Sequence, residues 1–237
     1  MSRLSNVPNF AKWESPANDL TPADGFTAGP SVQNIADTLR EGKYPTDRAF
    51  DRFLPSDLRL VSDNYWTPLI VAARVSEWLD EFNIRTVMDI GSGAGKFCVV
   101  AALASHCHFT GLEQRARLIA ASRMLAQRFG VEDRVSFVEG VFGKTPSIVS
   151  EAYYLFNPFE ENITHRYQHL DDDVELGNDR YLREIAATEA WLRAVPVGTY
   201  LVTYNGFGGR IPASYREIRV DRELPQELRM SRKERVV

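Results

Sequence analysis

The feature of this sequence that most restricts its fold is an apolar run that ends in an acid and breaks into three glycines, Thr86-Val87-Met88-Asp89-Ile90-Gly91-Ser92-Gly93-Ala94-Gly95-Lys96-Phe97. Such a run, followed by an apolar helical pattern, predicts a buried parallel strand, a tight turn and a helix start. Glycine permits positive φ angles, and its missing side chain lets a ligand approach the backbone. Dinucleotide enzymes space their glycines as Gly-x-Gly-x-x-Gly to approach a pyrophosphate. Here the third glycine comes one residue earlier, which favours a nucleoside site without phosphates; a plain strand-to-helix turn is the alternative.

The segments after this motif continue the alternation of strands and helices. Further strands are expected over residues 107–113, 134–140, 152–159 and 199–204. Strands separated by helical patterns predict a parallel sheet with helices on both faces. We expect residues 215–220 and 228–237 to add two antiparallel strands at the sheet edge, because charges that alternate with Leu228 and Met230 suit an exposed edge strand. The expected fold class is therefore α/β, with a doubly wound, mostly parallel seven-stranded sheet and an antiparallel edge hairpin.

The chain divides into an N-terminal arm with short helices, residues 1–63, and a main domain, residues 64–237. Proline and glycine favour an irregular arm up to residue 30, and Ser31 is the expected cap of a helix that stops at Gly42. Thr67 with Pro68 in the first turn predicts the start of the helix before the glycine strand. Tyr65, Trp66 and Thr67 are then placed over the mouth of the nucleoside site or, alternatively, packed at the helix entrance.

Composition excludes several classes of protein. The chain has 237 residues, a net charge of −4 and only two cysteines, Cys98 and Cys107, so neither a disulfide framework nor a cysteine metal site is expected. His165 and His169 have no third ligand, and no metal is expected there. No apolar run is long enough to cross a membrane. We expect a cytoplasmic protein without a membrane partner.

The acid at the end of the second expected strand, Glu113, lies 18 residues beyond Gly95. A carboxylate at that position can accept hydrogen bonds from both ribose hydroxyls of a nucleoside. The alternative is a capping acid, since a helical pattern follows immediately. Glu113 and the glycine turn together favour the ribose role.

With these motifs, residues 64–220 resemble a class I S-adenosylmethionine-dependent methyltransferase, which has a Rossmann-like fold. The resemblance rests on residues 87–95, Gly111-Leu112-Glu113, residues 137–142 and Leu155-Phe156-Asn157-Pro158-Phe159. It implies that Asp89 organises the cofactor ammonium group and that Glu113 holds the ribose. The residues implied to bind S-adenosyl-L-methionine are Tyr65, Thr67, Asp89, Gly91, Ser92, Gly93, Gly95, Glu113, Gln114, Val141, Phe142 and Asn157. Val141 stands where the family often has an acid that contacts adenine, so backbone groups of Val141 and Phe142, with the Phe142 ring, are expected to replace it.

The residues Asn157-Pro158-Phe159 suggest the acceptor side of the reaction. They are similar to the Asn-Pro-Pro-aromatic motif of amino-methylating nucleic-acid enzymes, in which an aromatic ring stacks on the base, although one proline is missing. They are also similar to an Asn-Asn-Phe-type motif of non-SET histone lysine methyltransferases. By these resemblances Asn157 accepts hydrogen bonds from the target amine, with Pro158 and Phe159 beside it; a turn-forming Asn before proline is the alternative.

The charges around this motif guide the choice of acceptor. Acids are concentrated between Glu160 and Glu175, and as a lid they would favour a cationic or amine-bearing acceptor, unless the segment is only a solvated loop. No basic trough is evident outside a small C-terminal group that we expect at a solvated edge: Arg229, Arg232, Lys233 and Arg235. The favoured function is N-methylation of an amine on a small molecule or protein side chain. The alternatives are a nucleic-acid amino methyltransferase and a non-catalytic cofactor-binding or partner-binding subunit.

Overall fold

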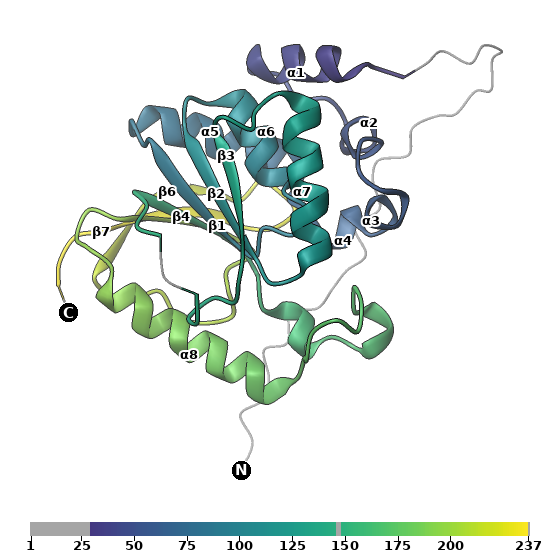
Figure 1. Ribbon diagram of the computed structural model, residues 1–237. Coiled ribbons are helices and arrows are strands. Elements are labelled where there is room, and N and C mark those ends of the chain that lie inside the picture. Colours follow the sequence, from purple (N-terminus) through teal and green to yellow (C-terminus); the bar gives the residue numbers. More distant parts are fainter. Residues whose placement is uncertain (1–28, 146–147, 237) are drawn as a thin grey trace.

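The computed structural model describes residues 29–145 and 148–236, and its centre is a seven-stranded sheet (Figure 1). The strand order is β3-β2-β1-β4-β5-β7-β6. The strands are β1 (Thr86–Ile90), β2 (His108–Glu113), β3 (Val135–Glu139), β4 (Ala152–Phe156), β5 (Tyr200–Tyr204), β6 (Tyr215–Asp221) and β7 (Leu228–Lys233). Strands β1 to β5 pair in parallel, whereas β7 is antiparallel to both β5 and β6. The predicted Rossmann-like fold class is confirmed.

Helices cover both faces of this sheet (Figure 1). The α-helices are α1 (Val32–Arg40), α2 (Asp47–Asp51), α3 (Ser56–Leu60), α4 (Ser62–Tyr65), α5 (Leu69–Glu81), α6 (Lys96–Ala104), α7 (Ala116–Phe129) and α8 (Asn178–Ala194). Two short 3-10 helices, η1 (Glu160–Ile163) and η2 (Arg166–Gln168), precede α8. None of the helices in the described ranges is long and apolar enough to cross a membrane.

Alternation along the strands divides the core into two parts. Val87 of β1 joins the larger core with α5, α6 and α7, whereas Met88 and Ile90 join a smaller core with Leu192 of α8. Successive side chains of a strand point to opposite faces, so a nearly continuous apolar strand can fill both cores. Helix α6 is buried from Lys96 to Leu103 because it lies between the sheet and neighbouring helices. This arrangement places the carboxyl ends of β1, β2 and β4 side by side.

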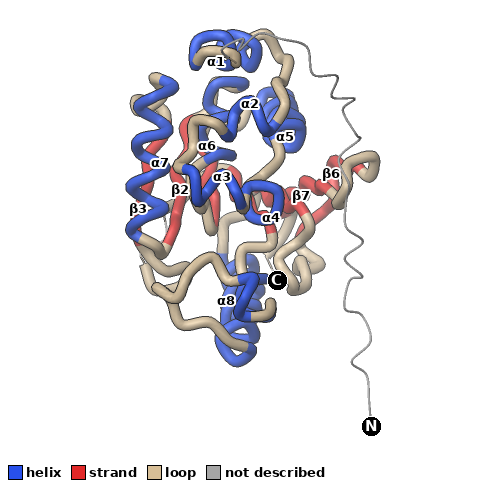
Figure 2. Tube along the Cα trace, turned by 90° about the vertical axis from the view of Figure 1, so that its right-hand side faces the viewer, coloured by secondary structure: helices blue, strands red, loops and turns tan. Residues whose placement is uncertain are grey.

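The N-terminal helices pack on the same face as α5 to α7 (Figure 2). As predicted, Ser31 caps α1, and its side chain accepts a hydrogen bond from the Asn34 N–H. Lys96 at the start of α6 forms ion pairs with Asp47 (2.6 Å) and Asp51 (2.7 Å) of α2. These buried contacts fix the short helices beside the glycine turn. The arm predicted for the first 30 residues lies almost wholly outside the described residues, which begin at residue 29.

The prediction that Thr67 caps the following helix is wrong. Helix α5 begins at Leu69 after Pro68, and it has no side-chain cap from Thr67. The Leu69 N–H instead donates to Asp47 Oδ1 at 3.0 Å, so a residue of α2 takes the capping role. The Thr67 hydroxyl is buried against the Tyr154 hydroxyl, 3.0 Å away.

The C-terminal strand is not the sheet edge that its charges suggested. Strand β7 lies between β5 and β6, and β6 forms the edge. Lys233 was expected in a solvated basic group, yet it is 1% exposed, and its Nζ donates to the carbonyls of Leu192 (3.1 Å) and Val195 (2.8 Å). The physical reason is the end of α8, whose free carbonyl groups need donors.

Candidate functional site

The glycine turn after β1 is required by both backbone conformation and packing. Gly91, Gly93 and Gly95 have φ angles of 79°, 53° and 77°. A Cβ atom on Gly91 would lie 2.9 Å from Pro158 Cβ, one on Gly93 would overlap the Trp66 ring, and one on Gly95 would lie 2.6 Å from Ser122 Cβ. The missing side chains therefore face other parts of the protein; the approach of a ligand to the glycine backbone stays a prediction.

Glu113 at the end of β2 is tied to this turn. Its Oε2 accepts the Gly93 N–H at 3.1 Å, and its Oε1 accepts the Arg115 N–H at 2.9 Å. The second bond satisfies the backbone donor of Arg115, which precedes the first residue of α7, and this helix has no side-chain cap. Burial raises the pKa of Glu113, whose side chain is largely hidden from solvent. A carboxylate has about four acceptor positions, so these backbone donors do not use all of them.

Asp89 in β1 is the second acid beneath the turn. It is 3% exposed, and the Cys98 thiol of α6 lies 3.5 Å from its Oδ2. Burial raises the pKa of Asp89 to about 7; the thiol hydrogen bond opposes this rise, and the Glu113 charge adds to it. Asp89 is therefore poised to gain or lose its proton near neutral pH.

Tyr65, Trp66 and Thr67 lie beside the turn, and Trp66 and Thr67 are buried there, as the alternative of packing at the helix entrance predicted. Their position over a nucleoside site stays a prediction. These three residues line a small pocket together with Asp89, Gly91, Ser92, Lys96, Phe97, Tyr154 and Phe156. The Ser92 hydroxyl is buried and has no hydrogen-bond partner in the described part of the chain. The space is about 20 Å³, enough for about one water molecule. A larger group can enter only when the surrounding side chains move.

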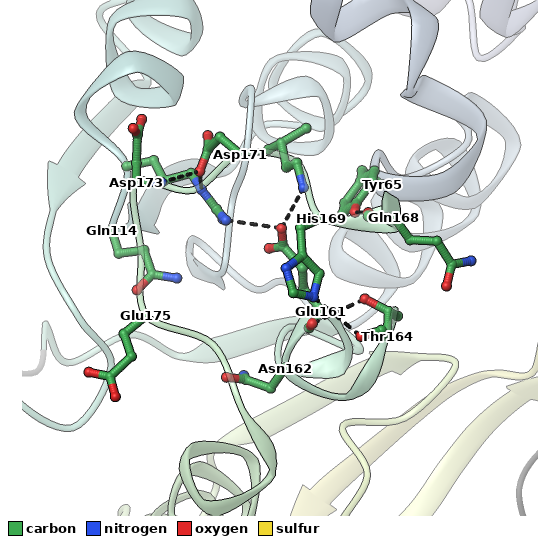
Figure 3. A network of polar contacts seen from close by, with 12 residues as sticks. Tyr65, Gln114, Glu161, Asn162, Thr164, Gln168, His169, Asp171, Asp173 and Glu175 are labelled. Atoms are coloured by element: carbon green, nitrogen blue, oxygen red, sulfur yellow. Dashed lines mark hydrogen bonds and ion pairs between the residues drawn. The ribbon is translucent and has the colours of Figure 1, made fainter. Parts of the chain in front are cut away.

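A segment that we name the strap, residues 160–173, lies across this region (Figure 3). Arg115 has a side-chain exposure of 4%, and it pairs with Glu161 (3.0 Å) and Asp171 (2.7 Å) of the strap. Arg117 also pairs with Asp171, at 2.6 Å. Near the other side of the network, the Tyr65 hydroxyl donates to the Gln168 carbonyl. The strap thus connects Tyr65, the last residue of α4 and part of the pocket wall, with the residues that follow β2.

The strap acids do not act as the uniform negative field that the sequence suggested. Burial favours the neutral form of Asp171, but its bonds to Arg115 and Arg117 outweigh this effect and lower its pKa. Glu161 is neutralised by Arg115, and Glu160 is used by Asn157. Arg115 was not identified from the sequence. The arginines at positions 115 and 117, opposite an acidic segment, were the signal that could have revealed the contact.

Asn157 follows β4 in the left-handed region, at φ 38°. Its backbone N–H donates to the Gly206 carbonyl at 3.0 Å, and its Nδ2 donates to Glu160 Oε2 at 2.7 Å. Burial raises the pKa of Glu160, while the Asn157 hydrogen bond favours its charged form. The bond to Glu160 orients the amide, so its Oδ1 is left as the acceptor.

The neighbours of Asn157 are packed into the protein. Pro158 contacts the glycine turn at Gly91, which brings the ends of β1 and β4 together. Phe159 is 4% exposed, and its ring centroid lies 6.2 Å from that of Phe142. Phe159 is therefore packed inside the protein against Phe142, and its ring is not exposed for stacking on a base.

The residues predicted near adenine are engaged with other groups. The Val141 N–H donates to Thr145 Oγ1 at 3.0 Å, so this backbone donor is already in use. Phe142 packs edge-on against Trp191, with ring centroids 5.3 Å apart. Gln114 Oε1 accepts a hydrogen bond from Arg180 Nη2 at 2.6 Å. Arg180 and Trp191 were not identified from the sequence, because α8 approaches this edge only in the folded chain. Thr145, four residues after Val141, was also not identified.

The sequence was compared with protein families and with curated proteins. Residues 83–166 match a family model described as a methyltransferase domain. No match was found among the curated proteins.

Solved structures share the fold at low sequence identity. An RNA methyltransferase from Salinibacter ruber in complex with S-adenosyl-L-homocysteine has a TM-score of 0.51 and 19% identity, and the match covers 72% of this chain and 95% of that chain. A putative O-methyltransferase from Klebsiella pneumoniae has a TM-score of 0.53 and 14% identity, with coverage of 85% and 96%. The mitomycin 7-O-methyltransferase MmcR has a TM-score of 0.51 and 18% identity, with coverage of 87% and 61%. These matches do not confirm the resemblance to histone lysine methyltransferases, which stays a prediction.

Proposed function

We propose that this protein, whose residues 83–166 match a methyltransferase domain, transfers the methyl group of S-adenosylmethionine directly to an amine nitrogen of a small molecule or a protein side chain. S-adenosylmethionine is the methyl donor of this enzyme. Transfer from a sulfonium is an in-line displacement, in which the protein mainly has to align donor and acceptor. The acceptor side of the site therefore carries the choice of substrate.

The donor side fits this cofactor in its chemistry. The bound cofactor supplies a methyl group on a positively charged sulfur. Glu113 has acceptor capacity left for the ribose hydroxyls, and Asp89 can hold the methionine ammonium group when it is ionised. The buried, unpaired Ser92 hydroxyl supplies a further polar contact in the same pocket. Tyr65, Thr67, Gln114, Val141 and Phe142 are proposed to line the rest of the cofactor site.

The observation that carries the proposed acceptor is the orientation of Asn157. Because Nδ2 is held by Glu160, Oδ1 is left as an acceptor, and the next residue, Pro158, contacts Gly91 of the glycine turn. An amine that donates a hydrogen bond to this oxygen is positioned by one N–H and keeps its lone pair for the methyl carbon. Proximity and orientation of this kind lower the barrier without a metal ion or a covalent nucleophile. Pro158 and Phe159 support the position of Asn157.

A radiolabelled methyl-transfer screen over protein, nucleic-acid and small-molecule fractions tests the proposal. Asn157→Gly removes the acceptor without backbone strain, because glycine tolerates the φ angle of 38°. We expect S-adenosylhomocysteine affinity to change less than about twofold while methyl transfer falls at least about tenfold, from the loss of one hydrogen bond at the reacting group.

Asn205→Gly is the matched control, because Asn205 also has a positive φ angle (55°) and follows the neighbouring strand β5. This variant should retain its transfer activity. Full activity of Asn157→Gly would reject the proposed role of Asn157, and label only in nucleic acid or in hydroxyl groups would reject the proposed acceptor.

A further inference from the structure

A second cleft lies on the N-terminal helices, apart from the pocket over the glycine turn. It is lined by Thr46, Arg48, Ala49, Arg52 and Arg59. Its volume is about 450 Å³, within the range of roughly 300 to 1,000 Å³ that is typical of small-molecule sites. Of the lining residues in the described part of the chain, three are arginines, in a protein whose net charge is −4.

Helix α2 separates its charges onto two sides. Asp47 and Asp51, one turn apart, both pair with the buried Lys96. Arg48 and Arg52, also one turn apart, line the cleft, and Arg59 of α3 joins them. Residues four apart lie on one face of a helix, so the acids and the arginines form two separate rows. The row of acids holds α2 against α6 through Lys96, and the row of arginines is exposed.

The arginines of the cleft differ from those that fix the strap. In the ranges 29–145 and 148–236, none of the three forms an ion pair with a carboxylate, whereas Arg115 and Arg117 both do. All three are exposed. The Arg52 side chain packs against Gly29 and lies 5.9 Å from the centroid of the Phe53 ring. The Thr46 hydroxyl accepts the Ala49 N–H at 3.3 Å, and its own hydrogen remains free to be donated.

We propose that this cleft binds a ligand through its phosphate groups. The planar guanidinium of arginine matches phosphate oxygens with two parallel hydrogen bonds, and a cluster of arginines without carboxylate partners favours an anion. The volume is larger than one phosphate requires, so the ligand class is a polyphosphate or a phosphorylated compound such as a nucleotide. The sequence suggested basic residues only at the C-terminus, because Arg48, Arg52 and Arg59 are not contiguous. This proposal does not depend on the proposed methyl transfer.

Calorimetry with tripolyphosphate, using the full chain, tests the site. The informative variant is Arg48→Gln/Arg59→Gln, which leaves the packing of Arg52 on Gly29 intact. We expect its affinity for tripolyphosphate to fall at least about tenfold, since each lost charge-assisted hydrogen bond contributes substantially to binding. Thermal melting is measured for each variant, and an unchanged melting temperature shows that the fold is retained.

The control is Arg85→Gln/Arg183→Gln, which removes the same charge from two exposed arginines outside the cleft. Its tripolyphosphate affinity should change less than about twofold. A labelled single-stranded RNA of twelve nucleotides, measured by fluorescence anisotropy, distinguishes the phosphate sources: a nucleic-acid backbone binds in competition with tripolyphosphate, whereas a small-ligand site binds tripolyphosphate alone. No binding of either probe, or equal losses in the two double variants, would overturn the proposal.

Discussion

At the scale of single residues, the unusual group is Asp89. Burial raises the pKa of Asp89 to about 7, so its carboxyl group is largely protonated below that pH. Only the ionised form attracts a ligand ammonium group, and binding below pH 7 must therefore release a proton. We expect the affinity for S-adenosylhomocysteine to fall about tenfold from pH 8 to pH 6, as the ionised fraction falls.

Calorimetry at several pH values in two buffers of different ionisation enthalpy measures both the affinity and the released proton. Asp89→Asn removes the titrating group, so its affinity should be lower at pH 8 and nearly independent of pH between 6 and 8. An equally steep pH dependence in Asp89→Asn would show that another group is responsible.

Glu113 is the residue whose removal should weaken the cofactor site most directly. Replacing Glu113 by Ala removes the proposed ribose contacts and the acceptor for the Gly93 N–H. We expect S-adenosylhomocysteine binding to weaken by about 1 to 3 kcal/mol, the usual effect for hydrogen bonds to a charged group. Isothermal calorimetry measures the change.

The matched control for Glu113 is Glu139→Ala. Glu139 is exposed and stands opposite Glu113 in the register of β2 and β3. Its removal changes the net charge by the same amount without touching the turn. Equal affinity losses in the two variants would show that the loss comes from the change in net charge, and would reject the proposed ribose contacts of Glu113.

At the scale of elements, Arg115 is the buried arginine among the contacts that hold the strap. Arg115→Gln leaves Glu161 without its cationic partner and leaves Asp171 with Arg117 alone, and breaking a buried ion pair commonly costs about 3 to 5 kcal/mol. Most of that cost is avoided if the strap detaches from the rest of the protein, because its carboxylates are then hydrated. We therefore expect faster limited proteolysis within residues 160–173, mapped by mass spectrometry.

Arg166→Gln is the control for the strap. Arg166 belongs to the same segment, but it forms an exposed ion pair with Asp172, with side-chain exposures of 83% and 76%. Exposed pairs contribute little, so the proteolysis rate should remain near that of the unaltered protein. Unchanged cleavage in Arg115→Gln would show that other contacts hold the strap.

The same elements show what the sequence can and cannot predict. The glycine turn and the cap at Ser31 were predictable, because both depend on neighbours within a few residues. The cap on Leu69 comes from Asp47, and the partners of Arg115 lie 46 and 56 residues away, so neither pairing has a local pattern. Asn157 was identified from its motif, whereas its orientation by Glu160 required the folded turn. The site was therefore predictable at its strand ends and unpredictable where the strap and α8 approach it.

At the scale of the whole molecule, Lys233 links the C-terminal strand to the far end of α8. Lys233→Met keeps most of the apolar volume but removes the donor to the Leu192 and Val195 carbonyls. Buried acceptors left without a partner cost about 1 to 3 kcal/mol, and we expect the free energy of unfolding to fall by that amount. Urea denaturation measures it.

The adjacent residue provides the control. Arg232 is exposed, and its guanidinium lies 5.6 Å from the centroid of the Tyr200 ring. Arg232→Met should change the free energy of unfolding by less than about 1 kcal/mol, the usual range for an exposed cation over an aromatic ring. If Arg232→Met lowers the free energy of unfolding as much as Lys233→Met does, any substitution in β7 is destabilising, and the effect does not come from the buried amine of Lys233.

The position of β7 between β5 and β6 also has a consequence for biosynthesis. The ribosome makes β6 before β7, yet among residues 29–145 and 148–236 the strand that pairs with β6 is β7 alone. While the chain is being made, β6 has no partner, and the side of β5 that later pairs with β7 is open. Unpaired strand edges can pair with other chains and cause aggregation. A nascent chain that has made β6 but not yet β7 is therefore exposed to aggregation, and a chaperone that covers these edges would protect it.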